Sequence, residues 1–172
     1  MTTISRRTAL FSAAALFATR LLPTRSAAAT SASAYCPSAK EREVLKRLNK
    51  LRAKHGRSAL KMDRGLGAAA RHHANDMAQR NYFNHKSPNG DRASNRARDH
   101  GYRGQRVGEN IASGYGTPER VMAAWAKSSG HRANMLGNQY RAVGVGFDPK
   151  GNYWVQVFGD RFNAKPACKD KK

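Results

Sequence analysis

The chain has 172 residues, which suits one domain with a sizeable core, and its formal net charge is +21. Residues 1–29 carry four arginines and no acid, so the remainder keeps a charge of +17. This charge favours anionic partners such as cell-wall polymers, lipid head groups or nucleic acid. The basic residues are scattered and no stretch has the pattern of a base-reading module. We therefore expect no specific nucleic-acid binding.

Residues 1–29 have the organisation of an export signal. They contain the pair Arg6-Arg7, an apolar run over 11–18 and small residues at 27–29. The adjacent arginines favour the twin-arginine route, and the run is shorter than the roughly 20 residues that span a bilayer. The alternative is a frayed amphipathic N-terminus. We expect an exported protein, periplasmic or secreted, that contacts membranes peripherally at most.

The two cysteines, Cys36 and Cys168, lie near opposite ends of the chain that remains after export. In an oxidising compartment we expect a disulfide between them. Two alternatives stay open: a lipid anchor on Cys36, although Ser33-Ala34-Tyr35 is a poor lipobox, and two unpaired thiols.

Two helices are predicted after a short lead at 30–40. Ser38 and Glu41 form a capping box for the first helix, which ends at Gly56. A brief connection over 60–62 follows, and Asp63 caps the second helix. Apolar residues recur at helical spacing along both: Val44, Leu45, Leu48 and Leu51 in the first, and Leu66, Ala69, Ala70 and Met77 in the second.

Two adjacent histidines occupy the second helix. His73 falls on its apolar stripe, which indicates a hydrogen-bonded core histidine rather than a ligand. His72 points about 100° away, so the pair cannot hold one metal from the same helix face.

A loop over 82–90 carries His85 between two aromatic residues and an S-P-N-G turn. Residues 91–100 then have a polar, helix-compatible pattern that closes at Gly101, and His100 is expected at the surface near its end. Residues 107–112 favour a strand.

Thr117-Pro118-Glu119 is a strong helix start. We expect this helix to bury Trp125, to be interrupted over 128–130 and to resume as a short turn over 132–136. Alternating apolar residues over 141–148 and 152–159 predict two strands, joined by a Pro149-Lys150-Gly151 turn into an antiparallel hairpin.

Helices before and between paired strands predict an α+β domain in which helices cover an antiparallel sheet. The predicted organisation is an export signal at 1–29, a lead at 30–40, one domain over 41–162 and a basic tail at 163–172. The sequence has no internal repeat, and we expect a monomer.

Four motifs occur in order: F-N-H-K-S-P-N-G, G-E-N-I-A, W-A-K-S-S-G-H-R-A-N-M-L and G-V-G-F…Y-W-V-Q-V-F-G. Together they resemble the CAP superfamily, the cysteine-rich secretory, antigen 5 and pathogenesis-related 1 proteins, and its bacterial secreted branch above all. The resemblance covers residues 44–159. It implies a three-layer α-β-α sandwich with a central cleft.

The resemblance also implies which residues line that cleft. His85 and His131 match the family's two histidines and Glu109 matches the glutamate of its G-E-N motif. Ser128 stands where eukaryotic members have a second glutamate. The family tetrad is thus a triad plus serine, with less negative charge than four matching residues would give.

This set of side chains permits three interpretations. His85 and His131 are ligand types that Zn²⁺ or another divalent metal accepts, and a bound water with Glu109 as base or orienting group would support hydrolysis of an extracellular or envelope substrate. Alternatively, the domain is a non-catalytic binding module for a lipid, a wall polymer or a protein. In the third interpretation, the triad is a hydrogen-bonded network that holds three loops together.

Overall fold

The computed structural model describes residues 35–168. The export signal predicted for 1–29, residues 30–34 of the lead and residues 169–172 lie outside the described part. The elements follow the chain in this order: α1 (Ala39–Lys54), β1 (Lys61–Met62), α2 (Arg64–Arg80), α3 (Ala93–Asp99), β2 (Val107–Ala112), α4 (Pro118–Lys127), α5 (Ser129–Leu136), β3 (Ala142–Asp148) and β4 (Tyr153–Gly159).

The four strands form one sheet in the order β1-β3-β4-β2. The predicted hairpin is confirmed as β3 and β4, and β2 pairs antiparallel with the outer side of β4. The 60–62 connection differs from the prediction, because Lys61 and Met62 pair parallel with β3. This pairing satisfies backbone groups between two helices: the Asp63 amide, for example, donates to the Val143 carbonyl at 2.9 Å. The sheet is therefore mixed rather than wholly antiparallel.

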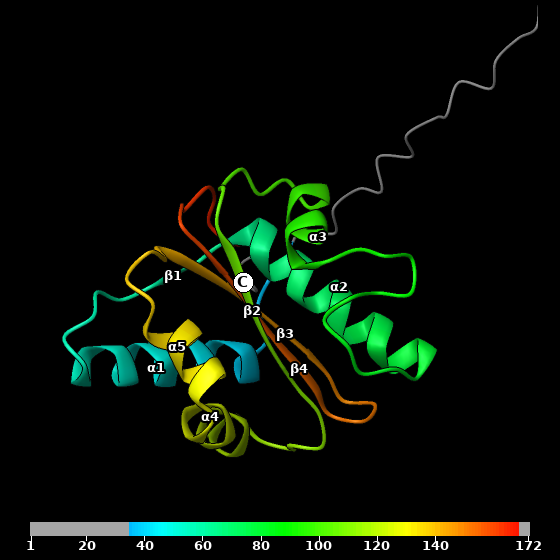
Figure 1. The fold of residues 1–172 in the computed structure, drawn as a ribbon, viewed down its shortest axis with the longest axis horizontal. Helices are drawn as coiled ribbons and strands as arrows, with labels where there is room; N and C mark the ends of the chain where they lie inside the picture. Colours follow the sequence, from blue (N-terminus) through cyan, green and yellow to red (C-terminus); the bar gives the residue numbers. More distant parts are fainter. Residues whose placement is uncertain (1–34, 169–172) are drawn as a thin grey trace, which may run out of the picture.

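Helices cover both faces of this sheet, as Figure 1 shows, so the predicted three-layer α-β-α sandwich is confirmed. α2 and α3 form one outer layer, and α1, α4 and α5 form the other. The α+β class is confirmed with it.

The two helical layers approach the sheet at different distances. On the α2 side, a Cβ added at Gly144 would lie 2.0 Å from the Leu66 carbonyl carbon, and one at Gly146 would lie 2.3 Å from that of Ala70. Backbone therefore packs directly on backbone there. On the opposite side, large buried rings fill the space: Trp125, Trp154 and Phe158.

The break between α4 and α5 is narrower than the sequence indicates. Ser128 alone leaves the helical region, with φ −86° and ψ 123°. Gly130 lies inside α5, which begins at Ser129 rather than at Arg132. A single extended residue is enough to redirect the chain, so the glycine is not needed as a break.

The ends of the described segment are tied together. Cys36 and Cys168 form the predicted disulfide, with their Cα atoms 4.8 Å apart and a sequence separation of 132. The chain after β4 also contacts the domain, because the amides of Asn163 and Ala164 donate to Oδ2 of the buried Asp63 at 2.8 and 3.0 Å.

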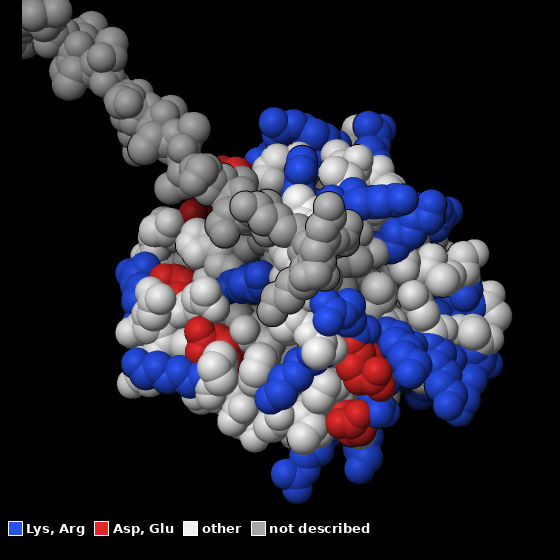
Figure 2. All heavy atoms as spheres, turned by 180° about the vertical axis from the view of Figure 1, so that it is seen from behind, with Lys and Arg blue, Asp and Glu red and all other residues white. Residues whose placement is uncertain are grey.

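Charge is spread over the surface. Figure 2 shows Lys and Arg side chains over much of the face opposite to that of Figure 1, with Asp and Glu in isolated places. In residues 35–168, no helix is both long and apolar enough to cross a bilayer.

Candidate binding cleft

Glu109 lies in the first half of β2, and its side chain is only 5% exposed. Its Oε1 accepts a hydrogen bond from His85 Nδ1 at 2.8 Å, and its Oε2 accepts one from Arg96 Nη2 at 2.7 Å. Both carboxylate oxygens are thus engaged by nitrogen donors. Buried carboxylates need such partners, because an unpaired charge away from water is costly.

Arg96 in α3 is the centre of this arrangement, and its side chain is 3% exposed. Besides Glu109, its guanidinium donates to the hydroxyl of Ser87 at 3.0 Å and to the carbonyls of Asp91 and His85 at 2.9 and 3.2 Å. Arg96 therefore fixes the 82–90 loop as well as the carboxylate. No sequence signal indicates this role, because Arg96 is one of several basic residues in a polar helix.

His85 is held at two points, because its carbonyl accepts from Arg96 and its ring donates to Glu109. A carboxylate only accepts, so Nδ1 carries the hydrogen that Glu109 receives. The ring is 51% exposed. Of the predicted site residues, His85 and Glu109 are therefore in direct contact.

His73 supports the same loop from beneath, and it is completely buried. Its Nε2 donates to the Asn84 carbonyl at 3.0 Å. Burial lowers its pKa to about 4, so the ring is neutral near pH 7. The prediction of a hydrogen-bonded core histidine is confirmed.

His131 comes from α5, which two buried or half-buried amides attach to β2. Asn110 Nδ2 donates to the His131 carbonyl at 3.1 Å, and Asn134 Nδ2 donates to the Glu109 carbonyl at 3.1 Å and to Asn110 Oδ1 at 3.0 Å. Partial burial lowers the pKa of His131, and the nearby His85 lowers it further. A neutral imidazole is thus favoured at this position.

A cleft of about 350 Å³ opens beside His131, between the end of β2 and the α4–α5 junction. Ser113, Ser128 and His131 contribute polar side chains to its lining. Two exposed rings stand at its edge, Phe83 at 50% and Tyr115 at 36% exposure. Its complete lining is Phe83, Ile111, Ala112, Ser113, Tyr115, Ala124, Trp125, Ser128 and His131.

The side chains of this region do not form the three-ligand donor set of a catalytic zinc site. In the described range 35–168, no group of three or more His, Cys, Asp or Glu side chains is arranged to hold a metal ion. His85 and His131 offer two imidazoles, while Glu109 is already paired with Arg96. A site with three protein ligands, as catalytic zinc usually has, does not fit these residues.

The chain therefore forms a three-layer α-β-α domain with a cleft at the end of β2. Residues 45–158 match the model of the cysteine-rich secretory protein family, CAP. The chain belongs to this family, as its motifs predicted.

Relatives support the same assignment. The chain is 38% identical over 135 residues to the uncharacterized protein YkwD of Bacillus subtilis (strain 168), a match that covers 78% of this chain and 51% of that protein. It is similar to a solved extracellular protein containing an SCP domain from Bacillus anthracis str. Ames, with a TM-score of 0.68, 30% identity, and coverage of 71% of this chain and 40% of that one. The chain thus spans about half the length, or less, of these two proteins.

The fold alone is shared with a solved outer surface protein from Borrelia burgdorferi. The TM-score is 0.66 at 20% identity, over 73% of this chain and 96% of that chain.

Proposed function

We propose that this protein is an exported, non-catalytic binding module that recognises a component of the cell envelope in the cleft beside His131. The export signal predicted at 1–29, the positive charge and the similarity to an extracellular SCP-domain protein support this localisation. The protein acts as a monomer, periplasmic or secreted, and its contact with membranes is peripheral.

The main observation behind this proposal is that both carboxylate oxygens of Glu109 already accept hydrogen bonds within the protein. Hydrolysis with Glu109 as the general base or as a metal ligand would need a carboxylate free to take up a proton or to ligate a metal. Glu109 instead accepts hydrogen bonds from Arg96 and His85, and its side chain is only 5% exposed, so its role is to position His85. The cleft itself is lined by aromatic rings, hydroxyl groups and His131. Such a lining, apolar with a few polar groups, is that of a ligand site.

Sedimentation with isolated cell envelopes tests the proposal. The purified full chain is expected to bind, and His131→Ala with Ser128→Ala is expected to weaken binding at least fivefold. Removing two distant exposed charges, Arg98→Gln with Arg103→Gln, is the control for general basic adhesion. Equal weakening in both double variants would reject the cleft as the binding site.

A second candidate is Zn²⁺, or another divalent metal, held by His85 and His131. The observation that favours it is the Glu109 hydrogen bond to His85 Nδ1, because carboxylates commonly orient a ligating histidine through its other nitrogen. Bound zinc would supply a Lewis acid at the mouth of the cleft.

Calorimetric titration with Zn²⁺ separates the two candidates. Binding that His85→Ala and His131→Ala each abolish would support the metal site. Binding that persists in the double variant, or none in the unaltered chain, would eliminate it, whatever the envelope assay shows.

A further inference from the structure

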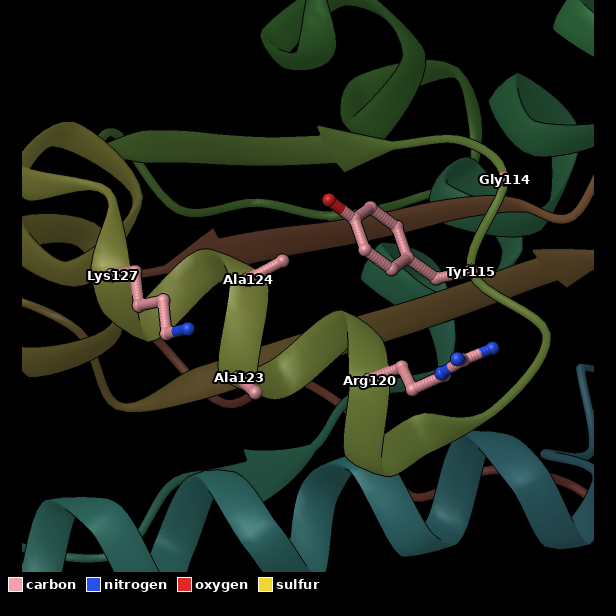
Figure 3. Close-up of a pocket in the computed structure, with 6 residues that line it drawn as sticks. All are labelled: Gly114, Tyr115, Arg120, Ala123, Ala124 and Lys127. Atoms are coloured by element: carbon pink, nitrogen blue, oxygen red, sulfur yellow. The ribbon is translucent and has the colours of Figure 1, made fainter.

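A second pocket adjoins the cleft along the outer side of α4. It is lined by Gly114, Tyr115, Arg120, Ala123, Ala124 and Lys127, and encloses about 630 Å³ (Figure 3). Tyr115 and Ala124 line both cavities, so the two pockets adjoin. Tyr115 stands at the boundary between them.

The pocket carries unbalanced positive charge. Within residues 35–168, neither Arg120 nor Lys127 forms an ion pair, and the pocket lining contains no acid. The nearest acid in sequence, Glu119, is paired with Arg47 of α1. The two cations are therefore free to receive anionic groups from a ligand.

The spacing of these cations indicates an extended ligand. Arg120 and Lys127 are seven residues apart on α4, which places them on the same face and about 10 Å apart along the axis. Ala123 and Ala124 between them leave the helix surface low, as Figure 3 shows. The pocket therefore suits a chain with repeated negative charges better than a single carboxylate or phosphate.

Tyr115 presents an aromatic face on a fixed loop. The Gly114 amide donates to the Gly151 carbonyl at 3.1 Å, Trp154 Nε1 donates to the Tyr115 carbonyl, and Lys40 Nζ donates to the Gly116 carbonyl at 3.1 Å. The backbone is anchored on three sides, yet the ring remains 36% exposed. An aromatic ring held in place and left open is a low-entropy contact surface for a flat ligand group.

We propose that these adjoining pockets bind an anionic glycan. A sugar ring stacks on Tyr115 and acidic substituents pair with Arg120 and Lys127, while the chain continues into the cleft beside His131. A lipid fits this pocket less well, because the floor between the cations offers an acyl chain only two alanine methyl groups. The inference rests on the proposed binding function and names the ligand class of that site.

Calorimetric titration of the purified full chain tests the glycan. An oligomer of galacturonic acid is the probe; maltoheptaose supplies rings without charge, polyphosphate supplies charge without rings, and phosphatidylglycerol vesicles supply a lipid anion. We expect the galacturonate oligomer to bind at least tenfold more tightly than the other three. No binding of it, or equal binding of any of the others, would overturn the proposal.

Substitutions in the pocket test whether the ligand binds there. Tyr115→Ala and the pair Arg120→Gln with Lys127→Gln are each expected to weaken galacturonate binding at least tenfold, whereas Arg98→Gln with Arg103→Gln changes it less than twofold. A loss in the control equal to that in the pocket variants contradicts the site. If envelopes bind but the pocket variants bind them unchanged, the glycan inference fails and the proposed function stands; if envelopes do not bind the unaltered chain, the proposed function fails.

Discussion

The regions at the two ends of β2 differ in whether their charged groups are already paired within the protein. At the Glu109 end, the buried carboxylate is paired with Arg96 and hydrogen-bonded to His85, and the neutral His73 supports the loop beneath. Beyond the other end, Tyr115 is exposed and the cations of α4 have no acidic partner in the described residues. Within residues 35–168, the first region pairs its opposite charges and leaves only Arg96 Nε without a partner, whereas the second has unpaired cations and an exposed ring.

This difference separates stability from recognition. Groups whose interactions are already satisfied inside the protein cannot be lost without a cost in folding, because the partner left behind is buried. Groups that wait for a ligand can be lost with little effect on folding. Each of the following substitutions should therefore affect mainly one of two measurements, unfolding free energy or ligand binding.

The largest effect is expected for Arg96→Met, which leaves the buried Glu109 carboxylate without its guanidinium. The free energy of unfolding should fall by about 3–5 kcal/mol, measured by urea denaturation near pH 7. Replacing both partners, Arg96→Met with Glu109→Leu, should recover much of the loss because no charge remains buried. Arg80→Ala breaks only a half-exposed pair with Asp76 and should cost less than about 1 kcal/mol. An Arg96 effect as small as that of Arg80 would show that the cluster is not held by this pair.

The second effect is pH-dependent and concerns His73. Its folded-state pKa of about 4 lies below the ordinary 6.5, so the unfolded chain binds the extra proton first. Stability should therefore fall as the pH drops from about 6.5 to about 4, by about 3 kcal/mol from this group. His73→Gln keeps an amide donor for the Asn84 carbonyl and cannot titrate, so urea denaturation across this range should show a shallower decline. Parallel curves for the two proteins would contradict the assignment, since the other titrating groups are common to both.

A smaller effect is expected for Asn134→Ala. The Asn110 side-chain oxygen and the Glu109 carbonyl lose a donor, which should cost about 1–3 kcal/mol. Because the same amides hold α5 against β2, the His131 ring should also become less fixed. NMR measurement of the His131 side chain, with Asn138→Ala at an exposed site as the control, should show the change in the first variant alone.

Most of the fold follows from local patterns in the sequence. Capping residues marked the starts of α1, α2 and α4, and alternation marked the β3–β4 hairpin, because these signals act within a few residues. The parallel pairing of Lys61 and Met62 with β3 was not predictable, since two residues carry no periodicity and their partners lie about eighty residues away.

The candidate site was less accessible from sequence. The triad came from resemblance to the family, because gaps of more than twenty residues between its members specify no geometry. Arg96 could not be distinguished from its basic neighbours, as only the folded chain shows which arginine becomes buried beside Glu109. Tyr115 likewise lay in a glycine-rich loop whose anchoring depends on Gly151, Trp154 and Lys40, all distant in sequence.

The smallest effect on stability, and the sharpest contrast with Arg96, is expected for Tyr115→Ala. The loop is anchored through backbone carbonyls and an amide that the substitution retains, and the ring itself is partly exposed to water. The free energy of unfolding should change by less than about 0.5 kcal/mol, while glycan binding falls at least tenfold. A matched loss of stability would mean that the ring supports the loop rather than receives a ligand, and the difference between the two ends of β2 would then disappear.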